Sequence, residues 1–290
     1  MKLFTSFVLC GLALCFATFA SAAPAPPTDN VEPIVGALTD HTSNITSSSN
    51  DVSTLGYDPS YDYHGWATVE IWTGGSQRRP VNYGDTRGAN LSDAIFNQLN
   101  KVCPPSLRNS GAGICPGSPY HPHGWRYFAT NALIKGDPWW QVEPRTAWVR
   151  VENGQFANEG IRTVMLQLAA DTLRAYTLES NGYNCYGVPG RYTGVYCNVP
   201  QLVRINLPVG RVGDWVIQNY LHIETWGTDY DHQFGFTVGE LKPCKTRKLV
   251  DQVMDKYQGD LVGLFPEWKN SFKREAKVII NGFDSCTNEP

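Results

Sequence analysis

The sequence predicts an α+β fold: an antiparallel sheet with helices on one side, joined by three disulfides. Residues 66–73 and 214–226 alternate apolar and polar side chains, which is the period of a half-buried strand. Residues 157–180 instead place Ile161, Val164 and Leu168 on one helical stripe. The order of elements mixes hairpin-like pairs of strands with separate helices and does not alternate strand and helix regularly. This order favours an α+β fold over repeated βαβ units.

The first 63 residues are not expected to belong to the folded domain. Residues 1–22 combine Lys2, an apolar run and a small-residue pattern ending at Ala22, which is typical of a secretory signal peptide. Residues 23–63 are dense in Pro, Ser, Thr, Asn and Asp, and we interpret them as a disordered leader or propeptide. Residues 64–290 should then form a single disulfide-stabilised domain.

The order of elements in that domain follows from local patterns. Alternation and aromatic content predict strands at 64–75, 124–134, 146–152, 200–207, 214–226 and 231–241. Apolar residues at helical spacing predict helices at 90–102, 157–180, 246–258 and 266–280. Asn90 or Ser92 is expected to cap the first of these helices.

Six cysteines remain after the signal peptide, and an even number in an oxidising compartment indicates three disulfides. Six cysteines allow 15 pairings. Two loops of equal length, each containing Gly and Pro, favour sequential pairing: Cys103 with Cys115, Cys185 with Cys197, and Cys244 with Cys286.

Charge and hydropathy limit the partners. The formal net charge is −3, and it becomes −4 once Lys2 leaves with the signal, which argues against a nucleic-acid ligand held by a basic surface. After the signal, the chain has no apolar stretch near the roughly 18 residues that a membrane span requires. We therefore expect a secreted, extracellular protein whose partner is a glycan or another extracellular protein.

The stretch HIETWGTDYDH, residues 222–232, concentrates ionisable side chains. If Gly227 and Thr228 form a two-residue turn, Glu224 lies directly opposite Asp231, with His222 on the same face. Opposed carboxylates repel, so a bound cation, an arginine or a shared proton should relieve them. Such a pair predicts glycoside hydrolysis, with Glu224, Asp231 and His222 as catalytic residues. The alternative is a solvated surface without chemistry.

Two further groups are candidate binding residues. His121 and His123, separated by one proline, could chelate a divalent cation, which is the one cofactor that the residues suggest; a solvent-exposed loop is the alternative. Trp139 and Trp140 are adjacent, so an extended backbone directs them to opposite sides. We predict that one of them, together with Trp226, stacks on a ligand. The alternative is that these indoles belong to the core.

Short motifs indicate covalent processing. Asn44 and Asn90 stand in Asn-x-Ser/Thr sequons, which predict N-glycosylation. Lys273-Arg274 resembles the dibasic cleavage sites of secreted precursors, although it falls inside the helix predicted at 266–280.

Together these features predict a secreted binding protein of the effector, toxin or adhesin type that recognises a glycan or a surface protein. A secreted hydrolase that acts on glycans through Glu224 and Asp231 is the first alternative. A non-catalytic cell-wall or matrix component is the second.

Overall fold

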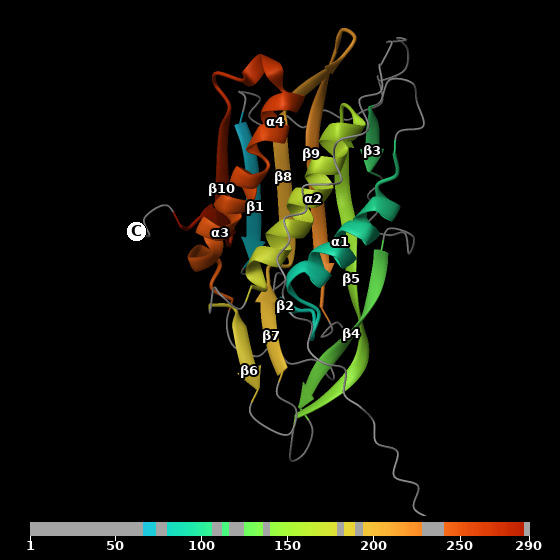
Figure 1. The fold of residues 1–290 in the computed structure, drawn as a ribbon, viewed down its shortest axis with the longest axis vertical. Coiled ribbons are helices and arrows are strands. Elements are labelled where there is room, and N and C mark those ends of the chain that lie inside the picture. The colour runs from blue at the N-terminus through green and yellow to red at the C-terminus, as the bar shows by residue number, and fades with distance from the viewer. Residues whose placement is uncertain are drawn as a thin grey trace, which may run out of the picture. The chain divides into compact units, whose positions relative to one another are not determined.

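The computed structural model describes residues 66–73, 80–105, 112–115, 125–135, 140–178, 183–188, 194–227 and 241–286 (Figure 1). The strands are β1 (Trp66–Thr73), β2 (Val81–Asn82), β3 (Gly113–Cys115), β4 (Trp125–Lys135), β5 (Trp140–Phe156), β6 (Cys185–Val188), β7 (Gly194–Val199), β8 (Leu202–Val212), β9 (Trp215–Trp226), β10 (Lys273–Ile280) and β11 (Phe283–Asp284). The helices are α1 (Gly88–Val102), α2 (Glu159–Tyr176), α3 (Pro243–Lys256) and α4 (Gln258–Leu264), followed by the 3-10 turn η2 (Pro266–Trp268). All described residues belong to one unit, 45–290. The expected signal peptide, and the expected boundary between leader and domain at residue 63, lie outside the described residues.

The large sheet is mixed, so the prediction of a purely antiparallel sheet is wrong. Its strand order is β11-β10-β1-β8-β9-β5-β3, and β4 pairs with the first part of β5. The pairs along this path are antiparallel except that β1 and β10 run parallel, with Val69 opposite Ala276. The chain reaches β10 through α3 and α4 and not through a hairpin, so no tight turn fixes its direction.

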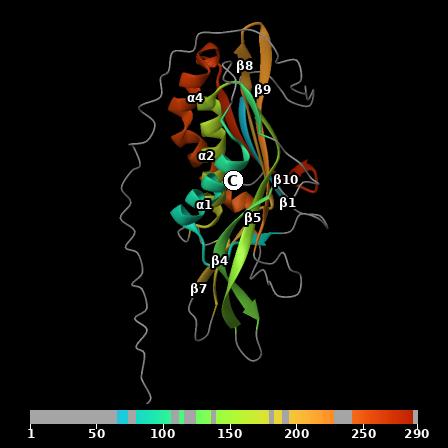
Figure 2. The same ribbon diagram turned by 90° about the vertical axis from the view of Figure 1, so that its right-hand side faces the viewer.

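The helices α1 to α4 lie on one face of this sheet (Figure 2). α2 buries Ile161, Met165 and Leu168 against it. The facing side chains come from alternate strand positions, such as Val69 of β1, so burial on this side follows the two-residue period of the strands.

The start of α1 differs from the prediction. The helix begins at Gly88, and neither Asn90 nor Ser92 caps it. The Gly88 N–H donates instead to Thr177 Oγ1, just beyond α2, at 2.9 Å. Ser92 is buried and donates to Asp171 of α2 at 2.6 Å. Tertiary partners therefore replace the local cap that the sequence favoured.

The three predicted disulfides are confirmed as cysteine pairs in the structure. Cys103–Cys115 joins the end of α1 to β3. Cys185–Cys197 connects directly opposed residues of β6 and β7, within a second sheet of order β2-β7-β6. Cys244–Cys286 joins α3 to the chain beyond β11. Such bonds fit folding in an oxidising compartment.

The helix predicted at 266–280 is wrong, because this segment forms η2 and then strand β10. Trp268, Ala276 and Ile280 recur at multiples of four residues, which suits a helix. Ala276, Val278 and Ile280 also share one face of a strand, and the sequence does not separate the two patterns. Pairing with β1, 207 residues earlier, decides the outcome by burying Ala276 and Val278 completely.

The dibasic pair Lys273-Arg274 opens this strand, so the folded protein is expected to resist a dibasic-specific protease. Cleavage after Arg274 requires a stretch of chain that β1 holds in the sheet. Reducing gel electrophoresis should show an intact chain from the folded protein and a cut chain after reduction and unfolding. Equal cleavage rates for the two forms would contradict this prediction.

Candidate functional site

The candidate site is the face of the large sheet that points away from the helices. None of the described helices lies on it (Figure 2). β1 directs Trp66, Glu70 and Trp72 to this side, while Ala67, Val69 and Ile71 are buried against the helices. We call this surface the open sheet face. Its central members are Glu70, Trp72, Arg150, Arg204, Asn206, Tyr220, His222 and Glu224.

Arg204 of β8 lies at the centre of the open sheet face. Its cross-strand neighbours are Glu70 of β1 and His222 of β9. Its guanidinium carbon lies 4.2 Å from the ring centroid of Trp72, which is a cation–π contact. Trp72 Nε1 donates to Glu70 Oε2 at 3.0 Å. A cation, an anion and an indole thus form one charge-balanced group.

Glu224 is held by an arginine, and its side chain is only 14% exposed. Arg150 Nε donates to Glu224 Oε2 at 2.6 Å, and Gln201 Nε2 donates to the other oxygen at 3.4 Å. Burial raises the pKa of Glu224 by more than the ion pair with Arg150 lowers it, and the nearby Glu152 adds to the rise. Glu224 is therefore easier to protonate than an exposed glutamate.

The predicted pairing of Glu224 with Asp231 is not the one that the sheet uses. Both ladder positions beside Glu224 are occupied, by Arg150 of β5 and by Leu202 of β8. The prediction assumed that β9 pairs with the segment that follows it, whereas β9 is an interior strand. Arg150 supplies the charge relief that was expected beside Glu224. Asp231 itself lies outside the described residues.

Aromatic side chains extend the open sheet face from β9 toward β4. His222 is 5% exposed, and its ring centroid lies 5.4 Å from that of Tyr220. Trp226, a predicted ligand contact, lies opposite Trp148 of β5. The Trp148 ring packs against Tyr127 of β4 with 5.2 Å between centroids. Because Tyr127 is largely exposed, this aromatic row reaches solvent.

Three buried polar atoms around this face have no hydrogen-bond partner among the described residues: Arg204 Nε, Asn206 Oδ1 and Gln201 Oε1. Buried polar atoms in proteins are nearly always bonded, either to the protein itself or to water or a ligand. One donor and two acceptors beside the open sheet face are therefore buried without a hydrogen-bond partner among the described residues.

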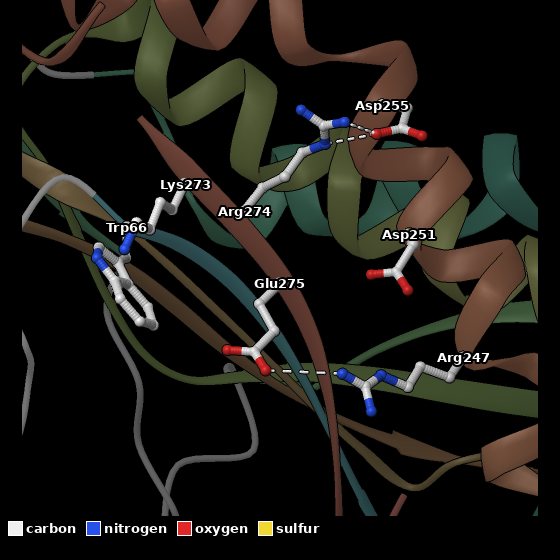
Figure 3. Close-up of a pocket in the computed structure, with 7 residues that line it drawn as sticks. All are labelled: Trp66, Arg247, Asp251, Asp255, Lys273, Arg274 and Glu275. Atoms are coloured by element: carbon white, nitrogen blue, oxygen red, sulfur yellow. Dashed lines mark hydrogen bonds and ion pairs between the residues drawn. The ribbon is translucent and has the colours of Figure 1, made fainter. Parts of the chain in front are cut away.

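A pocket of about 680 Å³ lies at the edge of the large sheet, between the start of β10 and α3 (Figure 3). Its lining residues are Trp66, Arg247, Asp251, Asp255, Lys273, Arg274 and Glu275. Lys273 points toward Trp66 in Figure 3, and its Nζ lies 4.8 Å from the indole centroid. Trp66 and Lys273 thus form the wall of the pocket that the sheet contributes.

Most charges of this pocket are paired with one another. Arg274 of β10 bonds to Asp255 of α3 (Figure 3). Arg247 of α3 lies 3.6 Å from Glu275 of β10, measured from Nη2 to Oε1. Because each pair contains one cation and one anion, the pocket has little charge left for an ionic ligand.

Asp251 has a structural role beside the pocket. Its Oδ1 accepts from the Ala276 N–H of β10 at 3.0 Å. Burial raises the pKa of Asp251, against the opposing effects of this hydrogen bond and of Arg247. Among the described strands, β11 pairs with only Ile279 and Ile280 on this edge of β10. Asp251 thus occupies one backbone donor on a strand edge that could otherwise pair with another chain.

Several predicted site residues lie outside the described part of the chain: Asp231, Trp139, His121, His123 and Asn44. Trp140 opens β5, but its side chain also lies outside what the structure describes. Asn90 is exposed on α1. Within the described residues, no three His, Cys, Asp or Glu side chains are arranged to hold a metal ion.

Patterns in the sequence alone do not reveal the two arginines of the site. Arg150 and Arg204 come from strands that lie 74 and 18 residues from their partners Glu224 and His222. The alternation in β1 did carry a usable signal, because it placed Trp66, Glu70 and Trp72 on one face.

Comparisons with known proteins identify no relative: no family model, no curated protein and no solved structure matches this chain. None of the helices in the described part of the chain is long and apolar enough to cross a membrane.

Proposed function

We propose that this protein is a secreted binding protein that holds a glycan on the open sheet face. The observation that carries the proposal is the set of three unpartnered buried atoms, Arg204 Nε, Asn206 Oδ1 and Gln201 Oε1. A sugar hydroxyl both donates and accepts hydrogen bonds, so one saccharide satisfies donors and acceptors of this kind together.

The surroundings of these atoms favour a sugar over other ligands. Indoles such as Trp72 and Trp66 supply flat apolar surfaces on which the C–H face of a sugar ring stacks. The charged side chains occur as neighbouring opposite pairs, Arg150 with Glu224 and Arg204 with Glu70, which suits an uncharged polar ligand. A nucleic acid would need an excess of cations that this chain lacks.

Two features support secretion. The chain starts with a sequence typical of a signal peptide, and six cysteines form three disulfides. Glycans are abundant outside the cell, so a glycan ligand is consistent with a secreted protein.

The test is binding to a glycan array, followed by calorimetric titration with the strongest ligand. Arg204→Lys keeps the charge and removes Nε, and Asn206→Leu keeps the shape and removes Oδ1. Each variant should weaken binding by about tenfold or more, because a buried hydrogen bond to the sugar is lost. Arg211→Lys is the matched control, since Arg211 lies in the same strand but is exposed at the β8–β9 hairpin tip. Absence of glycan binding, or equal weakening by all three variants, would overturn the proposal.

Glycan hydrolysis is the second candidate, and the raised pKa of Glu224 favours it. A general acid must hold its proton near the working pH, and burial moves Glu224 in that direction. If the protein is a hydrolase, the bound oligosaccharide will release new reducing ends, and Glu224→Gln will stop the release. An oligosaccharide that binds and stays intact would exclude this candidate.

A further inference from the structure

The sequon Asn90-Leu91-Ser92 occupies the first turns of α1, and its three side chains have different surroundings. Asn90 is exposed, whereas Leu91 and Ser92 are buried. Asp93 and Asn97, three and seven residues after Asn90, are also exposed, so Asn90 belongs to the outward stripe of the helix. A large group attached to its amide nitrogen would extend into solvent without displacing the core.

The hydroxyl of Ser92 is not accessible in the folded protein. Ser92 is 3% exposed, and its Oγ donates to Asp171 Oδ1 at 2.6 Å. Asp171 also accepts from the Tyr257 hydroxyl at 2.8 Å, so Ser92 is part of a buried group that joins three helical segments. An enzyme that reads Asn-x-Ser must reach the serine hydroxyl in an extended segment. Neither condition holds once α1 packs on α2.

We propose that Asn90 carries an N-linked glycan that is attached before α1 folds, and that Ser92 afterwards becomes the donor to Asp171. In the transfer, Asn90 Nδ2 forms a bond to the anomeric carbon of an oligosaccharide activated as a diphosphate ester. The bond between that carbon and the diphosphate oxygen breaks, the diphosphate leaves, and the amide nitrogen loses one proton. Ser92 is thus recognised first by the glycosylating enzyme, and its hydroxyl later stabilises the folded protein.

This modification is independent of the proposed ligand site. α1 belongs to the helix layer, whereas the open sheet face lies on the other side of the large sheet (Figure 2). A glycan at Asn90 would therefore leave the open sheet face uncovered. It would shield the exposed stripe of α1.

The first experiment expresses the full chain with its own signal in a eukaryotic secretory host. Peptide mapping by mass spectrometry should find a glycan at Asn90 in the wild type and in Ser92→Thr, and none in Asn90→Gln or Ser92→Ala. Ser92→Ala should also lower the unfolding midpoint well below that of Asn90→Gln, because it alone removes the bond to Asp171. An unmodified Asn90 in the wild type would overturn the proposal.

The second experiment tests the order of events. Folded, unglycosylated protein with its three disulfides is incubated with an oligosaccharyltransferase and its lipid-linked donor, beside the same protein reduced and unfolded. Transfer to Asn90 is expected in the unfolded sample and should be at least tenfold slower in the folded one. Equal rates would show that Ser92 is accessible after folding and would overturn the proposed order.

Discussion

Replacing Asp171 by alanine is expected to lower the free energy of unfolding by roughly 3 to 5 kcal/mol, because two buried hydroxyl donors lose their charged acceptor. Asp171 is 5% exposed and accepts from Ser92 of α1 at 2.6 Å and from Tyr257 at 2.8 Å. Lys256 Nζ completes the group at 3.1 Å. One carboxylate therefore joins α1, α2 and the junction of α3 with α4.

The control for this substitution is Lys256→Met. The Lys256 side chain is 55% exposed, so solvent already screens its charge, and its loss should cost less than about 1 kcal/mol. Urea unfolding followed by circular dichroism at pH 7 compares the variants. If Asp171→Ala and Lys256→Met lose the same amount, the buried hydroxyl bonds do not carry the stability assigned to them.

Asp171 also makes the free energy of unfolding depend on pH in a defined direction. Burial alone would raise the pKa of Asp171, but hydrogen bonds from Ser92 and Tyr257, together with the charge of Lys256, lower it below the ordinary value. A lowered folded-state pKa contributes stability that is complete above the unfolded-state pKa, about 3.9, and is lost as pH falls through the folded-state value. The stability difference between the wild type and Asp171→Asn should therefore shrink below about pH 4. A difference that stays constant down to pH 2 would contradict this assignment.

Local patterns in the sequence predicted those elements whose signal lies within the element itself or in a short loop. The alternation of residues 66–73 and 214–226 places the strands β1 and β9, and the equal cysteine spacings give the correct disulfides. The direction of β10 could not be predicted, because its partner β1 lies about 200 residues away and the turns beside β10 do not specify it. Its Val278-Ile279-Ile280 run was the available signal, since branched residues favour strands.

The candidate site shows the same limit. The two-residue period of β9 placed His222 and Glu224 on one face, which holds in the structure. Period alone does not identify the neighbouring strand, so Arg150 was missed and Asp231 was assigned in its place. The solvent exposure of a polar strand face also depends on the strands beside it. It can therefore be read only from the complete sheet.

Replacing Arg150 by methionine is expected to lower the free energy of unfolding by about 3 kcal/mol at neutral pH, because it leaves a largely buried carboxylate without its cation. The Arg150 and Glu224 side chains are 15% and 14% exposed, and Arg150 Nε donates to Glu224 Oε2 at 2.6 Å. The double variant Arg150→Met with Glu224→Gln removes both charges and should recover most of the loss. Four unfolding curves form the double-mutant cycle.

The sign of the pH effect is opposite to that at Asp171. The pKa of Glu224 is already raised by burial, and without Arg150 it must rise further. A carboxyl with a raised folded-state pKa favours the folded state below its unfolded-state pKa, about 4.3, and this advantage is lost as pH rises through the folded-state value. The deficit of Arg150→Met should therefore be full at pH 7 and shrink toward pH 4, whereas the double variant should show no such change.

These variants also separate a role in stability from a role in the site. If Glu224 and Arg150 only support the sheet, the double variant will be stable and will bind the glycan as the wild type does. If the pair contacts the ligand, the double variant will be stable and will bind at least tenfold more weakly. Hydrolysis predicts a third pattern, in which Glu224→Gln binds the oligosaccharide as well as the wild type and leaves it uncut. A double variant as unstable as Arg150→Met would show that the loss does not come from an unpaired carboxylate, and the ion-pair assignment would fail.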